Sequence, residues 1–170
     1  RAKPEAEELS HPKGIFYRRA GMNLEGRVVA LFPGQGAQYL EMGRELALNF
    51  PEVREAYRSL DALFKRDQAQ PLSEVVFPTP AFDGPGKQAQ AAALQRTEYV
   101  QPAVGAFSAG LWRVLVRSGF RADFLAGHSF GELSALWAGG ALSDDDYFML
   151  VRARGKAMAP PADTNFDAGT

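Results

Sequence analysis

The segment "AGHSFGELSALWAGG", residues 126–140, contains the pattern G-x-S-x-G, which constrains the fold more than any other feature of the chain. An apolar run, "ADFLAG", leads into it, and a helical pattern follows. Glycines two residues before and after a serine let backbones approach closely, so the pattern predicts a sharp turn from strand to helix. Such a turn exposes Ser129 beside the free N–H groups of a helix N-terminus. Ser129 is therefore a candidate nucleophile, but so short a pattern also occurs in ordinary turns.

A nucleophilic serine needs a general base, which is usually a histidine. The chain has two histidines, His11 and His128. Side chains of neighbouring residues diverge at a sharp turn, so we expect His128 to pack or hydrogen-bond beside the site rather than take the serine proton. His11 falls in the polar N-terminal segment. The sequence thus predicts half of a catalytic pair.

The order of elements predicts an α/β fold. Strands are expected at residues 27–32 and 122–127, and helices at residues 39–49, 51–66, 71–77, 98–117, 130–140 and 143–158. Residues 78–90, rich in proline and glycine, are expected to form an exposed loop. Alternating strands and helices indicate a parallel sheet with flanking helices. Because two or three strands are too few for such a sheet, we expect it to continue in sequence outside this chain.

Composition narrows the classes of function. The 170 residues are 46% hydrophobic and 23% charged with a net charge of −1, which is ordinary for a globular domain and gives no sign of nucleic-acid or membrane-surface binding. No apolar run approaches the ~20 residues that span a bilayer. The absence of cysteine excludes disulfides, a cysteine-ligated zinc and a thiol nucleophile, and fits a reducing compartment, so we expect a cytoplasmic protein. Residues 1–25 are expected to be a linker or N-terminal extension, and residues 26–170 the folded unit.

Two further segments invite ligand-binding interpretations. "PGQGAQ", residues 33–38, lacks the G-K-[ST] ending of a phosphate-binding P-loop and the third glycine of a dinucleotide fingerprint, so we reject both. "SDDD", residues 143–146, fits a helix N-cap better than a metal site.

Four sequence blocks together resemble a known family. "PGQGAQ", "VQPA" (residues 100–103), "GHSFGE" (127–132) and "RARGKAM" (152–158) occur in this order in malonyl-CoA:acyl-carrier-protein acyltransferases and in the acyltransferase domains of polyketide and fatty-acid synthases. The resemblance covers roughly residues 27–160. The phenylalanine after the serine and the "GIFYRR" lead-in most resemble the iterative synthases of polyunsaturated fatty acids and enediyne polyenes.

The resemblance implies an α/β-hydrolase-like large subdomain, of which residues 26–170 would be the N-terminal part. It also implies a ferredoxin-like small subdomain and a catalytic histidine, both expected beyond residue 170. We therefore expect the C-terminal remainder of the domain, on a second polypeptide, to supply the base for Ser129.

The resemblance further implies a ping-pong acyl transfer. Ser129 would attack the thioester of malonyl-CoA, and the phosphopantetheine thiol of an acyl carrier protein would then take the acyl group. The backbone N–H groups of Gln35 and Phe130 match the oxyanion hole. Coenzyme A enters as the substrate thioester, and no permanently bound cofactor or metal is implied.

Three other residues match substrate-binding positions: Arg154 would pair with the malonyl carboxylate, while Gln101 and His128 would line the site. A guanidinium suits a carboxylate because it donates two parallel hydrogen bonds. Without the resemblance, Arg154 is indistinguishable from the solvated helix residues Arg152 and Lys156, and Gln101 from a residue that caps a helix start.

Two other classes of function stay open. A serine esterase or lipase of the α/β-hydrolase type shares the turn around Ser129 but leaves "PGQGAQ" and "RARGK" unexplained. A non-catalytic docking fragment is the second alternative. Stable acylation of Ser129 by an acyl-CoA favours transfer, fast hydrolysis favours an esterase, and unchanged synthase activity in Ser129→Ala favours docking.

Overall fold

A computed structural model describes residues 8–20 and 26–160 of the chain. Its elements are β1 (Glu8–His11), β2 (Ile15–Arg18), β3 (Val29–Phe32), α1 (Arg44–Asn49), α2 (Pro51–Arg66), α3 (Leu72–Val76), α4 (Gly84–Gln95), α5 (Thr97–Arg117), β4 (Phe124–Gly127), α6 (Phe130–Ala138) and α7 (Asp144–Ala157).

The two strands predicted from their apolar runs pair with each other. β3 and β4 run parallel, in a register that joins Val29 to Phe124 and Phe32 to Gly127. Helices α1 to α5 lie between them in sequence, as a parallel connection requires. The α/β class with a parallel sheet and flanking helices is therefore confirmed.

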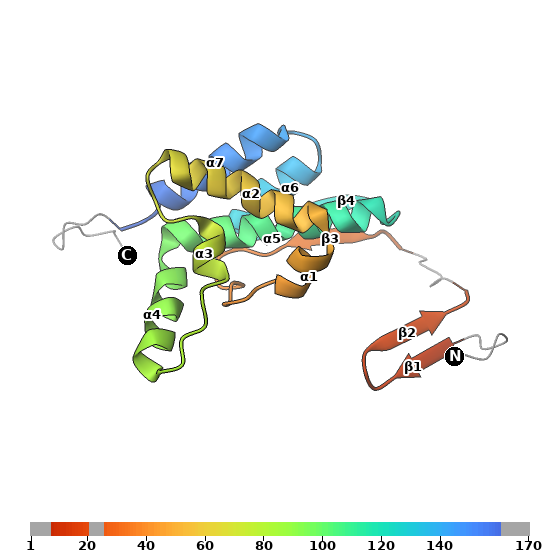
Figure 1. Cartoon of the computed structure of the whole chain (residues 1–170). Helices are drawn as coiled ribbons and strands as arrows, with labels where there is room; N and C mark the ends of the chain where they lie inside the picture. Colours follow the sequence, from red (N-terminus) through yellow and green to blue (C-terminus); the bar gives the residue numbers. More distant parts are fainter. Residues whose placement is uncertain (1–7, 21–25, 161–170) are drawn as a thin grey trace.

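Helix α5 lies at the centre of the described fold. In Figure 1, α2 and α7 lie along it, α6 lies between α7 and the strands, and α4 leads away from its N-terminal end. The core between these helices is apolar and fully buried, with the side chains of Leu60, Phe64, Val104, Tyr147 and Val151. Burial raises the pKa of the Tyr147 hydroxyl above its ordinary value, so this phenol stays neutral. The helices, and not the two strands, supply most of the buried core.

Helix α2 follows its sequence pattern from the first residue to the last. Pro51 stands in its first turn, where a missing N–H costs nothing. The apolar stripe at helical spacing is buried, at Val53, Ala56, Tyr57, Leu60 and Phe64. Tyr57 also donates its hydroxyl to the Met42 carbonyl at 3.1 Å, which joins α2 to the segment before α1.

Two sequence predictions need correction. The helix expected from residue 39 begins at Arg44, because Glu41 and Gly43 adopt left-handed backbone angles (φ 64° and 75°) and the Glu41 N–H bonds to the Val76 carbonyl. The loop expected at residues 78–90 is wrong from Gly84 onward, where α4 begins. Asp83 caps this helix by accepting a hydrogen bond from the Gly86 N–H, and Pro85 lies in its first turn.

Strands β1 and β2 form an antiparallel hairpin in the segment for which we expected a linker. Gly14 turns the chain with φ 77°, and Arg18 pairs with Glu8 at 2.6 Å across the strands. The rest of the expected linker, residues 1–7 and 21–25, lies outside the described residues, as do residues 161–170.

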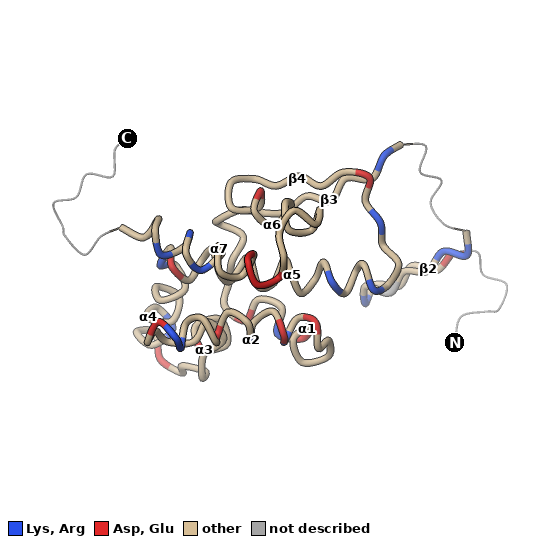
Figure 2. The backbone as a smooth tube through the Cα atoms, turned by 90° about the horizontal axis from the view of Figure 1, so that it is seen from above, with Lys and Arg blue, Asp and Glu red and all other residues tan. Residues whose placement is uncertain are grey.

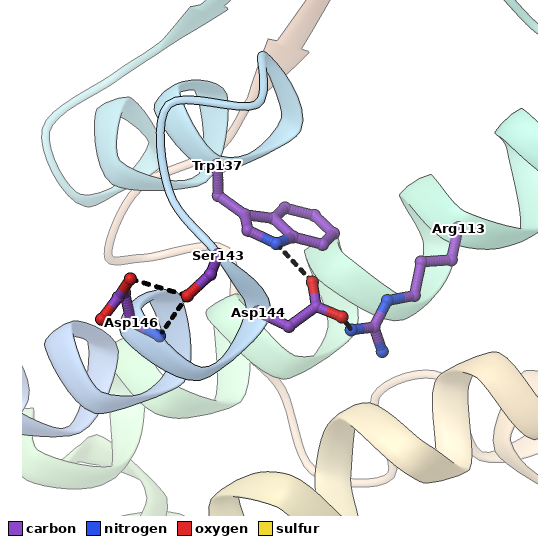
Figure 3. Close-up of polar contacts among 5 residues, drawn as sticks. All are labelled: Arg113, Trp137, Ser143, Asp144 and Asp146. Atoms are coloured by element: carbon purple, nitrogen blue, oxygen red, sulfur yellow. Dashed lines mark hydrogen bonds and ion pairs between the residues drawn. The ribbon is translucent and has the colours of Figure 1, made fainter.

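The start of α7 is tied to two other helices by polar contacts (Figure 3). The Ser143 hydroxyl accepts from the Asp146 N–H at 3.1 Å, which confirms the predicted N-cap. The Asp144 carboxylate accepts from Trp137 Nε1 at 2.8 Å and from Arg113 Nη2 at 2.7 Å, so one residue joins α5, α6 and α7. These bonds give the "SDDD" segment a structural role.

Charged residues are distributed along the helices, and Figure 2 shows both signs on several of them. Strand β4 carries no charge along its length. In residues 8–20 and 26–160, no helix combines the length and the apolarity needed to cross a bilayer.

The Ser143 cap yields a stability prediction. Ser143→Ala should lower the free energy of unfolding by about 1 kcal/mol, because the Asp146 N–H loses its acceptor. Ser143→Asn keeps a capping oxygen and should stay within a few tenths of a kcal/mol of wild type. Urea unfolding followed by circular dichroism measures both, and an equal loss in the two variants would contradict the capping role.

Candidate active site

Ser129 lies at the predicted strand-to-helix turn. Strand β4 ends at Gly127 and α6 begins at Phe130, so the chain reverses within two residues. Ser129 has φ 53° and ψ −110°, a conformation that non-glycine residues rarely adopt and that typically costs about 1–3 kcal/mol. The His128 N–H donates to the Phe32 carbonyl at 3.1 Å, and the Gly131 N–H donates to the His128 carbonyl at 2.9 Å. The turn is thereby held to β3, and the Ser129 side chain is exposed.

Glycines make this turn possible by close backbone contact. A Cβ placed on Gly127 would lie 2.1 Å from the Gly131 carbonyl carbon, and one on Gly131 would lie 2.1 Å from the Phe32 oxygen. A Cβ on Gly34 would lie 2.5 Å from the His128 oxygen. The loop after β3 and the turn after β4 therefore touch through positions that no side chain can occupy.

The two predicted oxyanion donors lie on these touching segments. Phe130 is the first residue of α6, so its N–H has no partner within the helix. Gln35 follows Gly34 in the loop after β3, and this loop is braced by a 2.8 Å bond from the Gly36 N–H to Gln38 Oε1. N–H groups from a helix N-terminus and from a glycine-rich loop suit a developing negative charge.

A buried glutamine connects the loop to helix α7. Gln101, on α5, is 1% exposed. Its Oε1 accepts from Arg154 Nη1 at 2.6 Å, and its Nε2 donates to Gln35 Oε1 at 3.4 Å and to Met158 Sδ at 3.5 Å. We call the contacts from Arg154 through Gln101 to Gln35 the Gln101 bridge. Gln101 lies inside α5 and faces the site, so it is not a capping residue.

Arg154 also lies beside the residue that follows Ser129. Its guanidinium carbon is 5.8 Å from the centroid of the Phe130 ring, within the range of a cation–π contact. The structure therefore brings Gln35, Gln101, Phe130 and Arg154 into one connected cluster next to Ser129.

The other two cations of "RARGKAM" have different surroundings. Arg152 is buried, pairs with Asp67 Oδ2 at 3.0 Å and lies 3.8 Å from the Phe64 ring centroid, so it holds α7 against α2. Lys156 is exposed. Within the described residues, Arg154 is the one of the three that contacts Gln101.

Neither histidine forms a hydrogen bond with Ser129 in the part of the chain that the structure describes. His128 is exposed and its ring lies against Gly34, whose Cβ position is 3.1 Å from Nδ1. His11 lies on the β1–β2 hairpin, where its Nδ1 accepts from the Lys13 N–H at 3.2 Å. His128 therefore lies beside Ser129 against the loop after β3, and neither histidine is hydrogen-bonded to Ser129 as a base in the described contacts.

Sequence reasoning overlooked two glycines that shape the cluster. A Cβ on Gly155 would lie 3.1 Å from Pro102 Cδ, and one on Gly105 would lie 2.9 Å from Phe130 Cζ. Each lies where α5 meets a neighbouring element. The available signal was a glycine inside a helical pattern, which costs about 1 kcal/mol relative to alanine and therefore points to a packing requirement.

The chemistry of the cluster suits an anionic, electrophilic ligand rather than a metal. The residues that face it offer a guanidinium, amide groups, backbone N–H groups and a hydroxyl. No three His, Cys, Asp or Glu side chains of the described ranges come close enough together to hold a metal ion.

A serine at a strained strand-to-helix turn, directly before a helix and in contact through His128 with a glycine-rich loop, places this α/β protein in the class with a nucleophile elbow. The family described as "Acyl transferase domain" matches residues 29–168. The chain therefore belongs to the acyl transferase domain family.

Curated relatives include large synthases. The chain is 35% identical over 151 residues to a polyunsaturated fatty acid synthase polypeptide of Thraustochytrium sp., covering 86% of this chain and 5% of that protein. It is 41% identical over 153 residues to the polyketide synthase GfsA of Streptomyces halstedii, covering 89% of this chain and 2% of that protein.

Solved structures agree on the family and the fold. The acyl transferase domain of ZmaA matches with a TM-score of 0.68 and 30% identity, over 82% of this chain and 31% of that chain. The acyl-carrier-protein S-malonyltransferase of Bartonella henselae matches with a TM-score of 0.63 and 35% identity, over 77% of this chain and 39% of that chain. The chain thus spans about a third of the solved proteins and a small part of the curated ones.

The glycine contacts at the turn give a second prediction. Gly131→Ala should destabilise the protein by about 3 kcal/mol, the upper end for overpacking, because the new Cβ meets the backbone oxygen of Phe32. Gly84→Ala is the matched control, since a Cβ there meets nothing within 4 Å. Thermal unfolding of both variants tests this, and a Gly131→Ala protein as stable as Gly84→Ala would rule out the close contact.

Proposed function

We propose that this chain forms the nucleophile-bearing part of an acyltransferase that moves a malonyl group from coenzyme A to an acyl carrier protein through an acyl-Ser129 intermediate. The observation that carries the proposal is the cluster of Arg154, Gln101 and Gln35 beside the exposed Ser129. Membership of the acyl transferase domain family supports it, as does likeness to the structures of acyl-carrier-protein S-malonyltransferases.

In the first half-reaction, Ser129 Oγ attacks the thioester carbonyl carbon and its proton passes to a base. The backbone N–H groups of Gln35 and Phe130 bind the oxyanion of the tetrahedral intermediate. The C–S bond then breaks, coenzyme A leaves as the protonated thiol, and the acyl group remains on Ser129. The phosphopantetheine thiol of the carrier protein reverses these steps and releases the serine.

Arg154 supplies the selectivity for a carboxylated acyl group. It is partly buried and already held by Gln101, so its guanidinium is oriented before the substrate arrives. A malonyl carboxylate would accept two parallel hydrogen bonds from it, and such charge-assisted bonds are about twice as strong as neutral ones. His128, exposed beside Gly34, would line the same site.

We further infer that the C-terminal remainder of the domain supplies the histidine that activates Ser129. Neither His11 nor His128 bonds to Ser129 among the described contacts, and solved relatives are about three times as long as the segment matched here. The proposal involves no permanently bound cofactor, nucleic acid or membrane partner, and it places the protein in the cytoplasm.

Covalent loading of Ser129 tests the core of the proposal. Malonyl-CoA should add one malonyl group to the intact domain, seen by intact-mass spectrometry, and Ser129→Ala should abolish the addition because no Oγ remains. An acyl group that transfers onto a carrier protein supports the acyltransferase. Rapid loss of the acyl group to water would indicate an esterase, and no loading would indicate a docking fragment.

Arg154→Ala tests the carboxylate clamp. Loading from malonyl-CoA should fall roughly ten- to a hundredfold, because a hydrogen-bonded charge contributes about 1.5–3 kcal/mol, whereas loading from acetyl-CoA should change little. Lys156→Ala, on the same helix but exposed, should leave both rates near wild type. Equal losses with the two substrates would count against Arg154 as the carboxylate-binding residue.

A further inference from the structure

Helix α5 has a notch opposite the residue that follows Ser129. Gly105 is buried, and a Cβ placed on it would lie 2.9 Å from Phe130 Cζ, 3.0 Å from Val151 Cγ1 and 3.3 Å from the Tyr147 hydroxyl. Phe130 itself is fully buried, so its ring has no solvent-filled space into which it can turn. The ring of Phe130 therefore occupies the space that a side chain at position 105 would take.

Hydrogen bonds, as well as close packing, fix the position of α5 at Gly105. Tyr147 donates its hydroxyl to the Gly105 carbonyl at 3.2 Å, and the Ser134 hydroxyl lies 2.8 Å from the same phenol oxygen. This buried network joins α5, α6 and α7 at one point. The separation of the three helices is thus fixed where Gly105 meets Phe130.

Gly105 lies one helical turn after Gln101, so both face the same side of α5. The side that carries the notch therefore also carries the Gln101 bridge. Any shift of α5 away from Phe130 and Val151 lengthens the 2.6 Å contact between Gln101 and Arg154, because Arg154 lies on α7 with Val151. A shift of Phe130 instead moves the N–H that we assign to the oxyanion hole.

We propose that Gly105 is a positioning residue for acyl transfer. The absence of a side chain at this position seats the Phe130 ring against α5 and fixes the oxyanion donor and the Gln101–Arg154 pair relative to each other. Gly105 contacts no substrate and acts only through Phe130 and α7. This inference rests on the proposed function of the site.

Gly105→Ala in the intact domain is the direct test. The rate of Ser129 acylation per folded molecule should fall about tenfold with malonyl-CoA, since displacements of an ångström at a reacting group can cost up to about a hundredfold. Acetyl-CoA loading should also fall, which separates this variant from Arg154→Ala. A wild-type rate per folded molecule would overturn the proposal.

Gly110→Ala is the matched control on the same helix. Its Cβ would lie 2.6 Å from Val53 Cα, so it disturbs the packing of α5 on α2 without touching Phe130. It should lower stability but leave the acylation rate of the folded fraction unchanged. Equal rate losses in Gly105→Ala and Gly110→Ala would show a general packing effect and contradict a positioning role.

A double variant tests whether the effect passes through the ring. Phe130→Leu removes the far end of the ring, so Gly105→Ala/Phe130→Leu should load faster than the two single losses multiplied together predict. If the loss of loading rate in the double variant equals the product of the two single losses, the proposal is contradicted. If Gly105→Ala alone does not fold, the double variant should still fold and load, and its failure to fold would contradict the proposal.

A crystal structure tests the positioning role of Gly105 without depending on whether the acyl transfer reaction occurs. In a crystal structure of Gly105→Ala, the Arg154–Gln101 contact or the position of Phe130 should have shifted. Unchanged positions would overturn the inference even if wild-type protein loads normally. A wild-type protein that is never acylated would instead overturn the proposed function.

Discussion

Backbone contact at the turn around Ser129 is the constraint on which the rest of the site depends. The β3 carbonyl of Phe32 accepts from His128 and also lies against Gly131, so a single strand end holds both sides of the serine. The strained φ of Ser129 persists because these contacts on both sides over-determine it. The same contacts bring the loop of Gln35 to the start of α6. The two N–H groups that we propose as oxyanion donors therefore come together through the packing that forms the turn.

The polar interior of the site obeys the rule that buried polar groups must be paired. Gln101 is nearly inaccessible, and both ends of its amide have partners, Arg154 on one side and Gln35 and Met158 on the other. Loss of one partner would leave a buried group unsatisfied, at a cost of about 1–3 kcal/mol. This cost fixes the orientation of the Gln101 amide, and the short 2.6 Å bond from Arg154 in turn orients the guanidinium.

Much of the fold could be predicted from the sequence because local signals agree with the tertiary structure. The stripe of α2, the Ser143 cap and the turn at Ser129 each depend on neighbours in sequence. The predictions failed where a local signal was overruled or misjudged. The Glu41 N–H bonds to the distant Val76 carbonyl, so α1 begins only at Arg44. Gly84, Pro85 and Gly86 form the first turn of α4 rather than part of a loop.

The residues of the candidate site could be predicted less completely than the helices and strands. The family resemblance predicted Ser129, Gln35, Gln101 and Arg154 as site residues, whereas local sequence signals alone could not distinguish Arg154 from Arg152. The packing separates these two arginines independently, because Arg154 contacts Gln101 and Arg152 pairs with Asp67. The role of Gly105 needs the three-dimensional contact with Phe130, because nothing in the sequence joins positions so far apart.

The Gln101 bridge also bears on how the proposed enzyme would discriminate between substrates. Without substrate, Arg154 is satisfied by a neutral amide oxygen. A malonyl group would exchange or share that acceptor for a carboxylate, which binds a guanidinium more strongly. An acyl group without a carboxylate would leave the Arg154–Gln101 bond intact and strand no charge. In this mechanism, selectivity arises mainly from what the correct substrate gains rather than from a penalty on the wrong one, so neutral acyl groups would load slowly instead of being excluded.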